Sequence, residues 1–261
     1  MNGCFFCGPT DSPLTKEHVW PKWVSRLLLG QYNSDHFRHL RAAGDNTTAN
    51  WRSRHLDVTT KTVCSDCNNE WLSIFENDQI KPLASPLIVG GDAVELTPES
   101  QSRLAAWAYK MAMLVEVANP DKSVEFFTPA ERLLFRQTTT AHPLVRVFLS
   151  RYDFGQRPAH ALTPCHRFEE KTGARRTFYL KISTITAGHL AMQVMSVRSA
   201  ESNELVPASE MEFEFCGTAR DAVIPIWPIV PESPSWPPVH TMSHDDIEAW
   251  TSMWEPGASN E

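Results

Sequence analysis

The sequence predicts an α+β protein with a small zinc-binding unit at its N-terminus, followed by a larger domain of helices and antiparallel strands. Three observations support this fold class. Two C-x2-C pairs lie near the N-terminus, a long apolar helical segment occupies 97–118, and several strand-like runs lie within 144–227. The chain has 261 residues, of which 42% are hydrophobic, so it can bury a substantial core.

The zinc-binding unit is predicted from four of the six cysteines. Cys4 and Cys7 have the C-x2-C spacing, as do Cys64 and Cys67. Outside the secretory pathway, paired cysteines bind metal more often than they form disulfides. Four thiolates would hold a structural Zn²⁺ in tetrahedral geometry and leave no open position for catalysis. The alternative is two unrelated C-x2-C motifs, one of them a redox dithiol.

The distribution of charge and apolar residues limits the cellular context. No run of 18 apolar residues occurs and the N-terminus lacks a secretory pattern, so we expect a cytoplasmic protein without a membrane span. The formal net charge of −7 argues against coating nucleic acid by overall charge. However, residues 228–261 hold six acidic and no basic side chains, whereas residues 22–61 hold seven Lys or Arg and three acids. A local basic surface is therefore compatible with the acidic total.

The segments around the cysteine pairs carry a more specific pattern. Cys4-x2-Cys7 is followed by EHVWP at 17–21 and by CSDCNN at 64–69. This order and local spacing resemble the HNH endonuclease superfamily in its zinc-bound, treble-clef-like form. The resemblance covers roughly the first 78 residues and implies a ββα-metal fold for residues 1–80.

The resemblance also implies hydrolysis of phosphodiester bonds in nucleic acid, with DNA preferred over RNA. His18 would be the general base that takes a proton from water, since an imidazole titrates near neutral pH. Glu17 and Asn68 would hold a catalytic Mg²⁺ or Mn²⁺ through hard oxygen atoms.

An alternative function stays open, because Thr59 and Glu70 stand where this family commonly has an asparagine and a basic residue. The chain would then be a catalytically inactive treble-clef module that binds nucleic acid or a protein partner. In that case His18 would be a structural histidine beside the zinc knuckle, and Asn68 would cap backbone donors at a helix start.

The basic segment between the cysteine pairs is a candidate surface for the nucleic-acid backbone. Trp51 is a candidate for stacking on an unpaired base. A solvated polar loop with a buried tryptophan is the alternative. The basic side chains expected to contact phosphates are Arg38, Arg41, Arg52, Arg54 and Lys61.

The remaining chain is expected to begin with a linker or short strand pair at 81–96. Residues 97–261 are then predicted to form an α+β accessory domain, with no assigned role and an acidic tail rich in Pro and Trp. Protein partners or a second copy of the chain are candidate ligands of this domain. Thr97 and Pro98 predict a helix start, and apolar residues on most faces predict a buried helix as far as Ala118.

Further elements of this domain are predicted from local signals. Thr128 and Glu131 match a capping box at the start of a second helix. Alternating residues predict antiparallel strands, two of which are joined by a hairpin at Ala187-Gly188. These strands are expected at 144–152, 176–186, 189–197, 211–215 and 222–227, with a last helix at 243–254.

Overall fold

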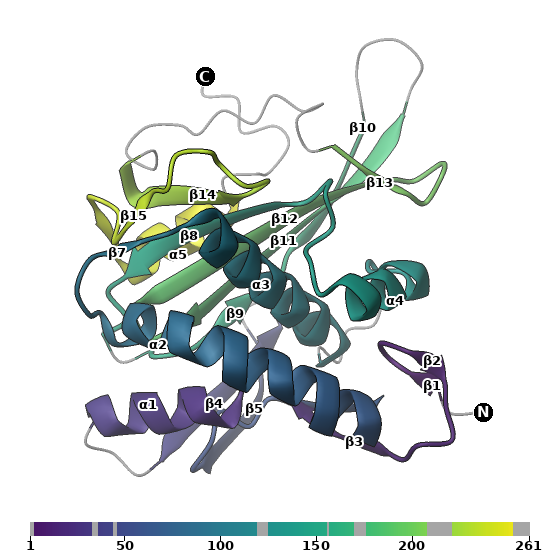
Figure 1. The fold of residues 1–261 in the computed structure, drawn as a ribbon, viewed down its shortest axis with the longest axis horizontal. Helices are drawn as coiled ribbons and strands as arrows, with labels where there is room; N and C mark the ends of the chain where they lie inside the picture. The colour runs from purple at the N-terminus through teal and green to yellow at the C-terminus, as the bar shows by residue number, and fades with distance from the viewer. Residues whose placement is uncertain are drawn as a thin grey trace.

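A computed structural model describes residues 3–32, 36–43, 46–118, 125–155, 157–169, 176–207 and 221–252, with the backbone alone for 32, 39–43 and 46–51. Its helices and largely antiparallel sheets confirm the α+β class. Figure 1 shows the N-terminal third below a twisted sheet, with helices between the two. The predicted strand at 211–215 lies outside the described residues.

The N-terminal third is built on a pair of antiparallel strands. Strand β3 (Leu14–His18) pairs with β6 (Thr59–Cys64), so that Glu17 lies opposite Thr60 and His18 lies opposite Thr59. Between these strands the chain forms helix α1 and a separate ribbon of β4 and β5. The other bounds are β1 (Gly3–Cys4), β2 (Gly8–Pro9), α1 (Lys22–Tyr32), β4 (Phe37–Ala43) and β5 (Asn46–Ser53).

A continuous helical segment follows the second cysteine pair. It contains two π-helical stretches, η1 (Cys67–Leu72) and η2 (Phe75–Ile80), and then α2 (Lys81–Val89). Residues 81–89, expected to belong to a linker, are therefore helical. The helix ends at Gly90, which has a left-handed φ of 73° and donates its N–H to the carbonyl oxygens of Pro86 and Leu87.

The packing of α2 explains why this segment is helical although it contains two prolines. Pro82 is the second residue of α2, which directly follows the π-helical stretch η2, and Pro86 lies one turn farther along. Ile80, Ala84 and Leu87 are buried at helical spacing and bind the segment to the core. Burial of this apolar stripe outweighs the backbone hydrogen bonds that Pro82 and Pro86 cannot donate.

The rest of the chain is organised around an eight-stranded sheet whose main path is β10-β11-β12-β8-β14. The predicted strands at 144–152, 176–186, 189–197 and 222–227 are confirmed, with small changes at their ends. The bounds are β8 (Arg146–Tyr152), β9 (Ala161–Leu162), β10 (Cys165–Glu169), β11 (Thr177–Ala187), β12 (Leu190–Ser199), β13 (Leu205–Val206), β14 (Val223–Trp227) and β16 (Thr241–Met242). A small separate sheet pairs β7 (Val94–Glu95) with β15 (Ser235–Trp236).

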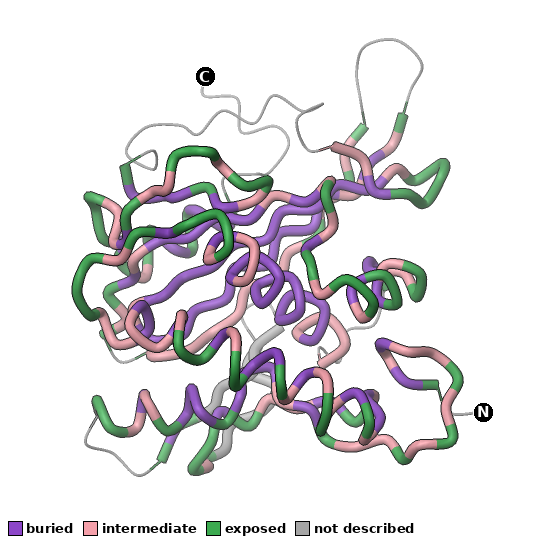
Figure 2. Tube along the Cα trace, viewed as in Figure 1, coloured by how far each residue is buried: buried purple, intermediate pink, exposed green. Residues whose placement is uncertain are grey.

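Helices cover both faces of the large sheet. Helix α3 (Pro98–Ala118) is buried over most of its length, as predicted, and packs on one face (Figures 1 and 2). Helix α5 (His244–Ser252) packs against β11 and β16 with Ile247 and Trp250 buried. Helix α4 (Pro129–Thr138) begins with the predicted capping box.

One apolar core joins the N-terminal third to the larger domain. It runs from Cys4 and Phe6, through α1 and α3, to Trp236. Trp23 of α1 stacks on Trp107 of α3 with ring centroids 5.8 Å apart. Residues 1–80 and 97–261 therefore do not form separate cores. Among the described residues, no helix combines the length and apolar character needed to cross a bilayer.

The β11–β12 turn gives a test of this shared core. Gly188 has a φ of +55°, and a Cβ there would lie 2.3 Å from the carbonyl oxygen of Ile88 in α2. Gly188→Ala should therefore lower the free energy of unfolding by about 2–4 kcal/mol, measured by urea denaturation. Gly30→Ala is the control, because nothing lies within 4 Å of its Cβ and the helix should gain about 0.5–1 kcal/mol. Equal stabilities of the two variants would contradict the close approach.

Candidate metal centre and adjoining polar site

The structure brings the four predicted metal ligands together. The sulfur atoms of Cys4, Cys7, Cys64 and Cys67 all lie within 4.8 Å of one another. The Sγ atoms of Cys7 and Cys64 are 3.7 Å apart. A tetrahedral Zn²⁺ with bonds of about 2.3 Å requires sulfur separations of about 3.8 Å. The donor set therefore fits a structural Zn²⁺.

Backbone contacts hold the two cysteine pairs in position. Phe5, inside the first pair, donates its N–H to Thr62 O on β6 at 2.7 Å. Cys64 N–H donates to Cys4 Sγ at 3.3 Å. Burial alone would raise the pKa of the Cys4 thiol, but backbone N–H groups, led by that of Cys64, lower it to about 7. The fold thus supplies donors that stabilise a thiolate, the form that binds metal.

Helix α4, far away in the sequence, packs directly on both cysteine segments. Its side chains at 132, 135 and 136, together with that of its C-cap Thr139, face the cysteine segments. Arg132 lies over the Phe5 ring at 4.3 Å, and Thr139 accepts a hydrogen bond from Trp71 Nε1 at 2.9 Å. Phe135 contacts the rings of Phe6, Trp71 and Phe75. The metal centre is therefore completed by the larger domain.

Arg136 brings positive charge to the cysteines. Its guanidinium lies 4.7 Å above the Trp71 ring, close enough to Cys67 to lower the pKa of that thiol. Burial raises the pKa of the Cys67 thiol to about 11, and Arg136 opposes this rise. Four thiolates around one Zn²⁺ carry a net charge of −2, so this arginine offsets buried negative charge.

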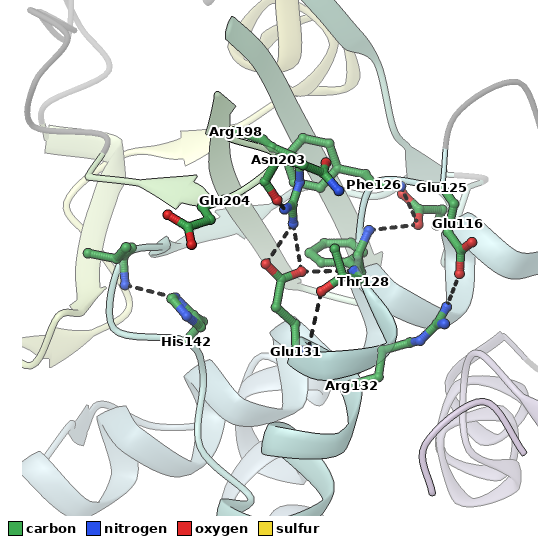
Figure 3. Close-up of polar contacts among 12 residues, drawn as sticks. Glu116, Glu125, Phe126, Thr128, Glu131, Arg132, His142, Arg198, Asn203 and Glu204 are labelled. Atoms are coloured by element: carbon green, nitrogen blue, oxygen red, sulfur yellow. Dashed lines mark hydrogen bonds and ion pairs between the residues drawn. The ribbon is translucent and has the colours of Figure 1, made fainter. Parts of the chain in front are cut away.

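The opposite side of α4 is fixed to the large sheet (Figure 3). Both carboxylate oxygens of Glu131 accept hydrogen bonds from Arg198 Nη2 on β12, at 2.7 and 2.6 Å. The same carboxylate accepts the N–H of Thr128 in the capping box. Arg132 pairs with Glu125 at 2.5 Å. Helix α4 therefore links the sheet rigidly to the cysteine cluster.

His18, the predicted general base, lies at the end of β3 with 17% of its side chain exposed. Its Nε2 is 3.8 Å from Oδ1 of Asp57, which is longer than a hydrogen bond. Burial, followed by the charge of Lys22, lowers the pKa of His18 below its usual 6.5. The imidazole is therefore mainly neutral at pH 7 and able to accept a proton.

Asn68, a predicted ligand of the catalytic cation, lies on the helix that follows Cys67. Its Nδ2 donates to Thr15 Oγ1 at 2.9 Å and to Lys16 O at 3.0 Å. These bonds join the helix to strand β3. Within the described part of the chain, no hydrogen bond uses its Oδ1.

Glu17, the other predicted ligand, occupies a different environment. Its side chain is only 7% exposed, and Oε1 accepts a hydrogen bond from Lys110 Nζ of α3 at 2.7 Å. Lys110 also donates to Glu76 Oε1 of η2 at 2.7 Å. The geometry therefore gives Glu17 a buried ion pair instead of a place on an exposed cation. The physical reason is strand alternation, which turns Glu17 inward and its neighbour His18 outward.

The buried group of Lys110, Glu17 and Glu76 has two carboxylates for one ammonium. Burial raises the pKa of Glu76 to about 7, with Lys110 opposing and Glu17 favouring the rise. The pKa of Lys110 is raised above its usual value, because the two carboxylates outweigh the effect of burial. Glu76 is thus the member that takes up a proton near neutral pH.

The side chains predicted to contact phosphates are spread along the basic segment between the cysteine pairs. Arg38 and Arg52 lie opposite each other on the β4–β5 ribbon, and Arg54 follows it. Lys61 lies on β6, and all four of these side chains are exposed. Arg41 lies on β4 opposite Ala49, and Trp51 lies on β5 opposite His39. The side chains of Arg41 and Trp51 lie outside what the structure describes.

Sequence reasoning missed Lys110, Glu76 and Arg136. A signal existed for Lys110, because one charge in the run AAWAYKMAML must find a buried partner. No comparable signal identifies Arg136, whose role depends on how α4 packs. Comparison with models of protein families, with curated proteins and with solved structures gives no match for this chain.

The contact between Arg136 and Cys67 predicts a loss of zinc affinity. Arg136→Gln should weaken zinc binding about tenfold or more, because it removes a charged donor from a thiolate. Competition with a chromogenic chelator would measure this, and Arg136→Lys should retain part of the affinity. Arg103→Gln, which removes an exposed arginine of α3, is the control. The inference fails if Arg136→Gln and Arg103→Gln hold zinc equally.

The raised pKa of Glu76 predicts a pH-dependent stability. The folded state holds this proton up to about pH 7, whereas an unfolded glutamate loses it near 4.5, so the contribution is lost as pH rises between these values. Between pH 5 and 8 the parent should lose on the order of 2 kcal/mol more unfolding free energy than Glu76→Gln, which keeps the Lys110–Glu17 pair. Urea denaturation at each pH would measure it. Glu99→Gln, at an exposed site, should parallel the parent, and parallel behaviour of Glu76→Gln would refute the assignment.

Proposed function

We propose that this protein is a metal-dependent endonuclease that hydrolyses phosphodiester bonds, with DNA as the preferred substrate. The observation that carries the proposal is the position of His18. It ends a strand that is paired next to the four-cysteine cluster, it is partly exposed, and its lowered pKa keeps it neutral at pH 7. These are the properties of a general base that must accept a proton from water.

Asp57 supports this role of His18. Its carboxylate is half exposed and lies 3.8 Å from Nε2. After proton transfer the imidazole carries a positive charge, and a nearby carboxylate stabilises that charge. Asp57 therefore acts as a positioning and charge-stabilising residue for His18.

A divalent cation would complete the chemistry by offsetting negative charge on the phosphate and on the leaving oxygen. Asn68 Oδ1 is the protein ligand that we assign to this cation, with phosphate oxygens and water filling other positions. Glu17 would become a second ligand only if its carboxylate left Lys110 and bound the cation instead. The four cysteines would hold a structural Zn²⁺ that fixes the other end of the strand pair, where Leu14 lies opposite Cys64.

The pairing of Glu17 with Lys110 also favours a second candidate function. A nuclease centre of the expected kind uses a free acidic ligand next to its histidine, and here that ligand is neutralised in the core. The second candidate is therefore a catalytically inactive zinc module that binds nucleic acid or a protein partner.

Cleavage assays separate the two functions. Zinc-loaded protein should cut plasmid DNA in the presence of Mg²⁺ or Mn²⁺, and His18→Ala should lower the rate about 100-fold or more. His240→Ala is the matched control, because that histidine is exposed and far along the chain. The parent rate should fall only below about pH 6.5, since His18 must be unprotonated. Equal rates for the two variants would exclude His18 as the base.

Asp57 is tested in the same assay. Asp57→Asn should slow cleavage about tenfold or more, because the imidazolium loses its counter-charge. Asp92→Asn, at an exposed position, should match the parent. If DNA is bound but not cut under any condition, the second candidate function stands in place of the first.

A further inference from the structure

We infer that the β4–β5 ribbon binds double-stranded DNA by entering its major groove. The inference rests on the proposed function, since it specifies how that site would receive its substrate. The proposed ligand is a DNA duplex in B form, and the composition of the sequence alone does not indicate this ligand.

The ribbon has the shape that this groove accepts. Strands β4 and β5 have 7 and 8 residues and pair only with each other within the described part of the chain. At about 3.4 Å per residue the ribbon is about 24 Å long, and its two strands lie about 4.8 Å apart. The major groove of B-form DNA is about 12 Å wide and admits a two-stranded ribbon. In Figure 1 the β4–β5 ribbon lies behind α1 and the helical segment that leads into α2.

The charges on the ribbon are arranged for an anionic partner. Arg38 and Arg52 are exposed and directly opposite each other across the two strands. Like charges in this position destabilise a ribbon unless an anion lies between them. Neither guanidinium has an ion-pair partner among the described residues, and the sequences of β4 and β5 contain no acidic residue. DNA phosphates or guanine edges supply the missing negative charge or acceptors.

The base of the ribbon adjoins the proposed catalytic histidine. Phe37 and Leu56 are buried where the ribbon begins and where the chain leaves it, and Leu56 N–H donates to Ser25 Oγ of α1 at 2.9 Å. Directly after His18, Val19 N–H donates to Val58 O at 2.9 Å. A duplex held by the ribbon would therefore have its backbone close to His18.

The same features discriminate between nucleic acids. The major groove of A-form RNA is too deep and narrow for such a ribbon. Single strands are bound mainly by stacking on exposed aromatic side chains. Of the ribbon side chains that the structure describes, the exposed ones are those of Arg38 and Arg52, which are cationic. Double-stranded DNA is thus the partner that the ribbon fits.

Binding by zinc-loaded, full-length protein tests this inference. Fluorescence anisotropy would compare a 30-base-pair DNA duplex with one of its strands and with duplex RNA of the same sequence, without Mg²⁺ or Mn²⁺. The parent should bind the DNA duplex at least tenfold more tightly than the other two. Arg38→Gln/Arg52→Gln should weaken duplex binding at least tenfold and reduce the salt dependence by about two phosphate contacts. Arg103→Gln/Arg167→Gln removes two exposed arginines elsewhere and should match the parent.

Methylation protection identifies the groove. The parent should protect guanine N7, which faces the major groove, and the Arg38→Gln/Arg52→Gln protein should not. Protection of adenine N3 in the minor groove, tighter binding to the single strand, or an unchanged affinity of the double variant would each overturn the inference. Failure of the proposed catalysis would look different. In that case the duplex is bound through the ribbon, and neither the parent nor His18→Ala cuts it.

Discussion

The buried ammonium of Lys110 is the constraint on which the arrangement of the molecule depends. Lys110 of α3 joins Glu17 of β3 and Glu76 of η2, and its side chain is fully buried. A buried charge without its partners is strongly destabilising, so these elements can pack in only one register. The strand that carries His18 is thereby fixed relative to the large sheet.

The cysteine cluster depends on a second long-range contact. Helix α4 meets the sheet through Glu131 and Arg198, and it meets the cysteine segments through Phe135 and Arg136. A small zinc-binding unit is expected to fold around its metal alone, because metal binding supplies folding free energy. Here the apolar side chains near the cysteines are covered by the rest of the chain, so metal binding and core formation are coupled.

Local signals predicted much of the fold. The capping box at Thr128, the alternation in the strands and the apolar length of α3 each report a physical preference within a few residues. The four cysteines were also found from spacing. The environment of Glu17 was not, because a carboxylate beside a histidine looks the same in sequence whether it faces solvent or a lysine 93 residues away. Helix α2 was missed because its burial outweighs its two prolines.

The contact between α4 and the cysteine segments also has a consequence for the order of folding. Synthesis proceeds from the N-terminus, and Phe6, Trp71 and Phe75 are made well before their shared neighbour Phe135. Until α4 leaves the ribosome, these rings have no cover from that helix and the thiolates lack Arg136. The nascent N-terminal third is therefore an incomplete folding unit, exposed to aggregation and to cysteine oxidation during the interval.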